Sequence, residues 1–139
     1  MSIQRVILPF TRRLAMPTAA AIAVLFGLAT LKSGGSVLFV DGAARIAAGN
    51  YVPFVLWFNF LSGFACIAMG AGLWLRRTWT TKLSLLMLVA TLIVFVAFGI
   101  FVLANGDYEL RTVGAMVLRS TVWLTLWLYS RHMPGKARI

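Results

Sequence analysis

Four long apolar stretches dominate the chain, and short polar segments separate them. They cover residues 16–40, 52–75, 83–104 and 112–130. Each is close to or longer than the roughly 20 residues with which a helix crosses a hydrocarbon layer about 30 Å thick. Apolar and polar residues do not alternate within them, as the strands of a membrane β-barrel would require. Because backbone polar groups in lipid must be paired within their own segment, the pattern predicts four transmembrane helices.

The segments between these stretches are short. Residues 41–51 form the longest of them, and no internal repeat or separate soluble segment is evident within 1–139. Short connections make consecutive helices antiparallel neighbours. The predicted fold class is therefore all-α, a polytopic membrane protein with one domain, residues 1–139, built as an antiparallel four-transmembrane-helix bundle.

Composition agrees with this fold and excludes the soluble classes. Hydrophobic residues make up 61% of the 139 residues, and charged residues only 12%. Soluble domains are about 45–50% apolar and about 25% charged. A chain with so few polar side chains cannot cover a water-exposed surface, so a soluble enzyme domain and a disordered chain are both excluded.

Basic residues predict the orientation. Nine of the thirteen Lys and Arg residues fall on one side of the four predicted helices, and two fall on the other side with all three acidic residues. Cytoplasmic loops carry an excess of Lys and Arg. We therefore expect a multi-pass protein of the inner (plasma) membrane of a bacterium, with both termini in the cytoplasm and residues 41–51 and 105–111 outside. The nine residues are Arg5, Arg12, Arg13, Arg76, Arg77, Lys82, Arg131, Lys136 and Arg138. The two on the other side are Arg45 and Arg111.

The net charge of +10 would suggest nucleic acid binding in a soluble protein. Here the charges lie along the membrane boundaries, where each contributes about 1 kcal/mol of attraction to anionic lipid. We expect the lipid bilayer as partner and no nucleic acid. The first 31 residues also carry the basic and apolar features of a targeting segment. Because no A-x-A cleavage pattern is present near residues 31–37, we expect an uncleaved first span after a short interfacial stretch.

Three strongly polar side chains fall inside the predicted helices. Lys32, Asn59 and Arg119 are seven or eight residues from the outer ends of their stretches, which places each roughly 10–12 Å below the outer surface. Polar side chains at such depth are costly and mark candidate sites. One interpretation is an outward-opening, positively charged pocket for an anionic head group, a carboxylate or quinone carbonyl oxygens, lined also by Trp57 and Trp123.

A second interpretation needs no ligand. Lys32 and Arg119 can bury their apolar stems and extend their charges to the outer interface. Asn59 can form a hydrogen bond between helices that serves assembly alone. Both interpretations remain open from the sequence.

Two glycine patterns accompany these residues. The adjacent Gly34 and Gly35, flanked by serines, favour a kink or a short unwound stretch in the first helix, and so are candidate hinge residues. Close helix packing is the alternative. Small residues also recur at helical spacing in the first two predicted helices and predict packing surfaces. These are Ala19, Ala23, Gly27, Gly63, Ala68 and Gly72.

Residues for catalysis or cofactor binding are scarce. The single cysteine, Cys66, excludes an internal disulfide, and His132 is the only histidine. No haem or metal site is evident, and no nucleophile–base pair or phosphate-binding loop is present. We therefore expect no catalytic activity of its own.

Two segments resemble the DoxX-like group of small four-helix membrane proteins. Residues 26–32, FGLATLK, look like the Gly-x-x-Lys-type feature late in the group's first helix, and residues 63–77, GFACIAMGAGLWLRR, are similar to its glycine-rich second helix and basic turn. Members of the group often carry an acidic residue before those glycines, where this chain has Asn59. The resemblance implies the four-helix fold and, for some members, a place in quinone-linked redox complexes.

Three functions follow as hypotheses. The first is binding of a membrane-soluble or anionic ligand of quinone or lipid type, or service as an accessory subunit of a membrane redox complex. The second is a purely structural or assembly role without a ligand site. The third is a small transporter, which at this length would need a homo-oligomer to enclose a pathway.

Overall fold

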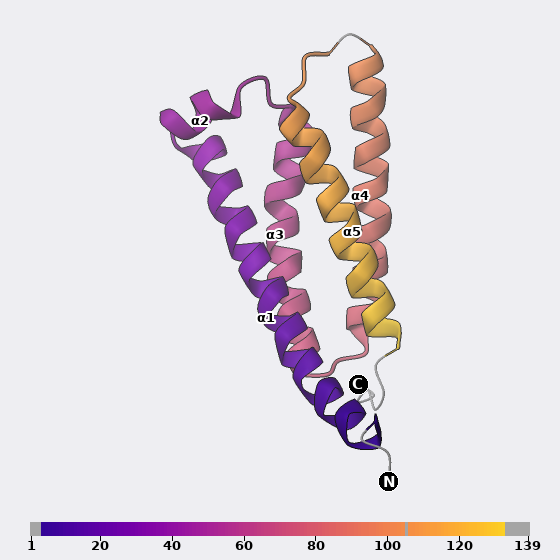
Figure 1. The fold of residues 1–139 in the computed structure, drawn as a ribbon. Coiled ribbons are helices and arrows are strands. Elements are labelled where there is room, and N and C mark those ends of the chain that lie inside the picture. Colours follow the sequence, from indigo (N-terminus) through magenta and orange to yellow (C-terminus); the bar gives the residue numbers. More distant parts are fainter. Residues whose placement is uncertain (1–3, 105, 133–139) are drawn as a thin grey trace.

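The structure, a computed structural model, describes residues 4–104 and 106–132. Within these residues the chain is all-helical and contains no β-strand, which confirms the predicted fold class at that level. Figure 1 shows the long helices running side by side, with consecutive ones in opposite directions. The helices are α1 (Gln4–Phe39), α2 (Ala43–Ala48), α3 (Pro53–Trp74), α4 (Trp79–Leu103) and α5 (Leu110–Arg131).

Three of these helices are long and apolar enough to cross a membrane, as judged over the described residues. They are Leu14–Phe39 within α1, Pro53–Trp74 and Trp79–Leu103. The helix α5 has 22 residues, as many as α3. Its apolar character is lower because Arg119 and several hydroxyl residues interrupt it. The structure therefore supports three of the four predicted spans, and the fourth stays a prediction.

Two features of the helices differ from the prediction. The first helix begins at Gln4, so the expected interfacial stretch continues directly into the span. The segment after α1, expected as a loop, contains the short helix α2 between Gly42 and Gly49, whose φ angles are 147° and 61°. Its AARIAA sequence is rich in alanine, the best helix former. Glycines at both ends supply backbone angles that other residues rarely adopt.

The helices pack in a chain-like order and do not form a closed ring. Extensive contacts join α1 to α3, α3 to α4 and α4 to α5, whereas α1 and α5 share no comparable interface. In Figure 1, α1 diverges from α3 toward the end of the molecule that carries α2. The fold is therefore open along one side, between α1 and α5.

Glycines bring the backbones of α1 and α3 into direct contact. A Cβ atom added at Gly27 would lie 2.7 Å from the carbonyl oxygen of Gly63, and one at Gly63 would lie 3.0 Å from the carbonyl oxygen of Gly27. Gly70 approaches the carbonyl oxygen of Ala20 in the same way, at 2.8 Å. Small residues let helices approach closely where lipid offers no competing hydrophobic gain. The predicted small-residue surface is thus present at Gly27 and Gly63.

Other members of that pattern serve different contacts. Ala23 is buried and Ala19 packs against the core, but Ala68 is exposed. A Cβ atom added at Gly72 would meet the side chains of Trp79 and Thr80, so this glycine serves the α3–α4 contact.

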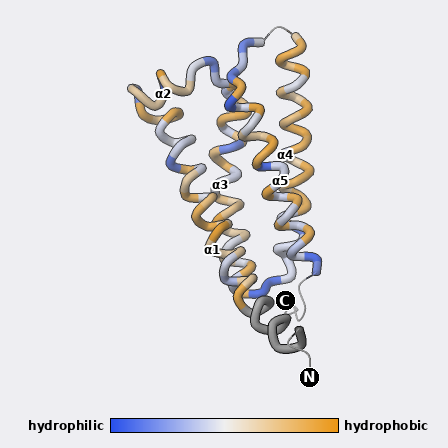
Figure 2. The backbone as a smooth tube through the Cα atoms, viewed as in Figure 1, coloured by the Kyte–Doolittle hydropathy of each residue, from blue (hydrophilic) through white to orange (hydrophobic). Residues whose placement is uncertain are grey.

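Hydrophilic residues gather at the two ends of the molecule, and α4 is almost entirely apolar between them (Figure 2). The turn between α3 and α4 contains Arg76 and Arg77, at the same end as Arg131 of α5. The acidic residues of the segments before α2 and α5 lie at the opposite end. Arg76, Arg77 and Arg131 therefore lie at one end of the described residues, and the acidic residues lie at the other end together with Arg45 and Arg111.

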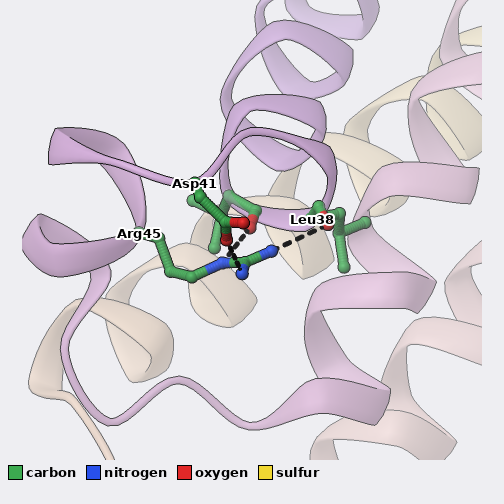
Figure 3. Close-up of polar contacts among 4 residues, drawn as sticks. Leu38, Asp41 and Arg45 are labelled. Atoms are coloured by element: carbon green, nitrogen blue, oxygen red, sulfur yellow. Dashed lines mark hydrogen bonds and ion pairs between the residues drawn. The ribbon is translucent and has the colours of Figure 1, made fainter.

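Arg45 caps the carboxyl end of α1 (Figure 3). Its Nε donates to the carbonyl oxygen of Val37 at 3.0 Å, and its Nη2 donates to that of Leu38 at 3.0 Å. The remaining Nη1 pairs with the carboxylate of Asp41. The last carbonyls of a helix lack partners within the helix and lie at its negative end. One guanidinium therefore satisfies two of them while keeping its own charge balanced.

The end of α3 supplies a first testable prediction. Arg76 has a φ of 53°, and the N–H groups of Arg77 and Arg76 donate to the carbonyl oxygens of Gly72 and Leu73. This is the Schellman arrangement, whose left-handed position glycine usually occupies. Because a side chain there is strained by roughly 1–2 kcal/mol, Arg76→Gly is expected to stabilise the protein by about 1 kcal/mol, measured by thermal unfolding in detergent. Arg77→Gly removes the same charge without relieving strain and should give no gain. Equal effects of the two variants would contradict this assignment.

Candidate functional site

A cavity of about 180 Å³ lies between α1, α3 and α5 at the end of the molecule that carries α2. Polar and apolar side chains from all three helices line it, together with residues from α2 and its connection to α3. The lining residues are Thr30, Ser33, Gly34, Val37, Ala48, Tyr51, Val52, Val55, Leu56, Asn59, Glu109, Arg111, Thr112, Ala115 and Arg119.

The cavity is the size of one small chemical group. Its volume corresponds to about six water molecules at roughly 30 Å³ each, and is close to the roughly 150 Å³ engineered cavity that holds one benzene ring. Pockets for drug-sized ligands are larger, at about 300–1,000 Å³. The site therefore suits a single head group or ring.

Asn59 lies on the cavity wall formed by α3. Its side chain is only 8% exposed, and its Oδ1 has no hydrogen-bond partner. The position follows from the helix period, because Val52, Val55 and Ser62 share the same inward face of α3 and are buried as well. A buried amide oxygen without a donor costs about 1–3 kcal/mol. After a small rotation of the Asn59 amide toward the cavity, a group with an O–H or N–H could pair with this oxygen and recover that energy.

Arg119 lies on the wall formed by α5. Its Nη1 donates to the carbonyl oxygen of Ala115 at 3.3 Å, one turn nearer the α2 end, and its buried Nε has no partner. Among the described residues the ion pair is that of Arg45 with Asp41, so no carboxylate balances Arg119. Arg119 thus lines the cavity without a carboxylate partner among the described residues.

The outer rim of the cavity ties α5 to the segment around α2. Glu109 Oε1 accepts a hydrogen bond from the backbone N–H of Asn50 at 3.1 Å. Arg111 Nη1 donates to the carbonyl oxygen of Ala47 at 3.3 Å. These two rim residues were not predicted as site residues, since the sequence pattern places them in an outer loop. Their spacing could have identified them. Glu109 is three residues before Thr112 and Arg111 is four before Ala115, and residues at these spacings lie on the helix face that also carries Arg119.

Lys32 is not part of this cavity. Its side chain is exposed, whereas Thr30, Ser33 and Gly34 of the same helix line the wall. Successive helical residues differ by about 100° in direction, so Lys32 points away although its depth matches that of Asn59 and Arg119. The structure brings Asn59 and Arg119 together and separates Lys32 from them. Its position suits the alternative interpretation, in which the charge extends toward the interface.

The two tryptophans expected in the pocket also lie elsewhere. Trp57 is 45% exposed and packs edge-on against Phe39 and Phe60, with ring centroids 5.8 and 6.2 Å apart. Trp123 is fully buried in the core, where its Nε1 has no partner. Neither indole ring therefore lines the cavity.

The expected hinge residues lie in regular helix. The helix α1 continues through Gly34 and Gly35 to Phe39, so no unwound stretch is present. A Cβ atom added at Gly34 would lie 3.2 Å from Cβ of Phe60. Gly34 therefore acts in close packing of α1 on α3 and in the cavity wall. Within the described residues there is no group of three or more His, Cys, Asp or Glu side chains that could hold a metal ion.

Comparison with protein-family models, curated proteins and solved structures finds no match to this chain.

Proposed function

We propose that this chain is a four-helix integral membrane protein whose cavity between α1, α3 and α5 binds the polar head of a membrane-soluble or anionic ligand. The observation that carries the proposal is the pair of unpartnered polar atoms, Asn59 Oδ1 and Arg119 Nε, on the walls of one cavity. An unpaired cation within the membrane is costly, and such residues are generally retained where they bind something. A ligand of matching charge lowers that cost.

The fourth span is part of the proposal. The helix α5 is as long as α3 and packs along α4. The arginine in the middle of this helix, Arg119, lines the cavity. A polar side chain that faces the interior of a membrane protein does not prevent its helix from spanning.

The proposed location is a bacterial inner membrane with both termini in the cytoplasm, which puts the cavity in the outer leaflet. The separation of basic and acidic ends in the fold supports this orientation. We also propose membership of the DoxX-like group, supported by the quoted segments of α1 and α3. In the structure these two segments pack on each other through Gly27 and Gly63.

Arg119→Met tests the binding function. The purified protein in detergent is titrated with a short-chain phosphatidylglycerol and with a short-chain benzoquinone, and its thermal midpoint is recorded. We expect at least one probe to stabilise the wild type, and Arg119→Met to weaken its binding about tenfold or more, as loss of a hydrogen bond to a charged group predicts.

Lys32→Met is the matched control, because it removes the same charge at a similar depth outside the cavity. The affinity of this variant for the probes should equal that of the wild type. Asn59→Leu should weaken binding while leaving the unliganded protein as stable as the wild type or more so, since it removes an unsatisfied oxygen. Absence of any probe-induced shift in the wild type would contradict the proposal and favour a purely structural role.

A further inference from the structure

We infer that the ligand of this cavity is an anionic phospholipid with free hydroxyl groups in its head, and that its hydrocarbon chain lies along the open side between α1 and α5. The inference rests on the proposed function and names the ligand class of the same site. It comes from two separate observations, the hydrogen-bonding needs of the cavity and a second, apolar groove between the same two helices.

The two unpartnered atoms lie just behind the cavity surface, so after a small shift of each side chain they favour a ligand that both accepts and donates hydrogen bonds. The free Nε–H of Arg119 needs an acceptor, and the free Oδ1 of Asn59 needs a donor. Quinone carbonyls only accept, so they leave Asn59 Oδ1 unpaired. A phosphate with an attached polyol accepts from Arg119 and donates to Asn59. It also supplies the negative charge that Arg119 lacks, which strengthens the hydrogen bond.

The rim of the cavity favours the same head group. Arg111 contributes a second positive charge, and Glu109 contributes an acceptor. A second negative charge near Glu109 would be repelled, whereas a hydroxyl group can donate to its carboxylate. Phosphoglycerol carries one charge and free hydroxyls, which fits this distribution.

The hydrocarbon chain must lie outside the head-group cavity, whose volume of about 180 Å³ holds one small group. A second groove of about 450 Å³ lies between α1 and α5, nearer the amino-terminal end of α1. Its lining is almost wholly apolar. The residues are Leu14, Ala15, Thr18, Ala19, Ile22, Thr125, Leu126 and Tyr129.

The cavity and the groove lie one after the other along the same side of the fold and share no lining residue. Both are formed by α1 and α5, the pair of long neighbours without a packed interface. From Thr30 of the cavity to Ile22 of the groove is eight residues, or about 12 Å of helix. One leaflet of hydrocarbon is roughly 15 Å thick, half of the bilayer core. A chain of about that length, extending from a head group beside Arg119, crosses the bilayer midplane and reaches the nearer end of the groove.

Four probes and three variants test this assignment. The thermal midpoint of the full-length protein in detergent is measured with glycerol 3-phosphate, long-chain phosphatidylglycerol, long-chain phosphatidylcholine and a short-chain benzoquinone. We expect phosphatidylglycerol to bind at least about tenfold more tightly than each of the others. Arg119→Met should remove that preference over phosphatidylcholine. Ala19→Phe fills the groove and should weaken phosphatidylglycerol binding several-fold without changing the weaker binding of glycerol 3-phosphate. Ala29→Phe, an equal change at an exposed position of α1, should leave both unchanged.

The outcomes separate this inference from the proposed function. Binding of the quinone in preference to phosphatidylglycerol would keep the proposed function and overturn the lipid assignment. Equal affinity for glycerol 3-phosphate and phosphatidylglycerol would also overturn it, because the ligand would then be a free phosphate ester without a bound chain. Absence of a shift with every probe would overturn both.

Discussion

Gly27→Val is expected to destabilise the protein by about 3 kcal/mol or more, the upper end of the range for overpacked positions. The added side chain would begin 2.7 Å from the backbone oxygen of Gly63 and 3.0 Å from Cβ of Cys66. Backbone atoms of a packed helix cannot move aside as a flexible side chain can. The variant must therefore separate α1 from α3, and its thermal midpoint in detergent should fall sharply.

Gly99→Val is the control for this prediction. It places the same β-branched side chain within α4, near its carboxyl end, where no atom lies within 4 Å of the added Cβ. Its stability should stay within about 1 kcal/mol of the wild type, the scale of helix-propensity differences. Gly63→Val acts on the same contact from the other helix. The double variant Gly27→Val, Gly63→Val should lose less than the sum of the two single losses, because either change alone opens the interface. Equal losses at Gly27 and Gly99 would contradict direct backbone contact.

Trp123→Ala is expected to cost about 3–5 kcal/mol, as truncation of a buried Trp does in other proteins. Trp123 is fully buried and belongs to the core cluster that joins α5 to α3 and α4, with Cys66, Met69 and Leu88. Van der Waals packing is a main attractive force between helices in lipid, so the cavity left by the truncated side chain lowers the stability directly. The measurement is unfolding in detergent or in bilayer discs.

Trp123→Phe separates packing from hydrogen bonding at the same position. It keeps an aromatic ring in the core and removes the unpartnered Nε1. The variant should lose less than about 1.5 kcal/mol of unfolding free energy, since the loss of packing contacts is offset in part by the removal of an unsatisfied donor. Ligand binding should be unchanged, because Trp123 does not line the cavity. A loss as large as that of Trp123→Ala would mean that Nε1 has a partner.

The helices could be predicted closely where hydropathy alone decides them. The second predicted span, 52–75, compares with Pro53–Trp74 in the structure, and the fourth, 112–130, with Leu110–Arg131. The short helix α2 was missed, because six residues between two glycines carry no periodic apolar signal. The first predicted span, 16–40, lies close to the apolar part of α1, Leu14–Phe39, and the helix itself extends further, to Gln4.

The sequence predicts that Asn59 and Arg119 lie at one level of the fold, but it does not predict the direction in which the side chains point. Depth follows from counting residues along a helix, so Asn59, Arg119 and Lys32 were placed in one layer. Direction depends on which face of each helix packs inward, and an amphipathic pattern cannot show this when lipid and core are both apolar. The inward face of α1 is set by Ala23, Gly27 and their contact with α3. That face carries Thr30 and Gly34 into the cavity and leaves Lys32 outside.

The cap on α1 has a bearing on how the chain inserts. Asp41 and Arg45 are the two charged residues of segment 41–51, and they form an ion pair. In the proposed orientation this segment is moved across the bilayer during insertion. Moving one unbalanced charge through the membrane potential changes the free energy by about 2.3 kcal/mol per 100 mV. With the two charges cancelled, the crossing is electrically neutral. Arg45 can therefore cap the carboxyl end of α1 at the outer surface without an electrical cost to the insertion of this segment.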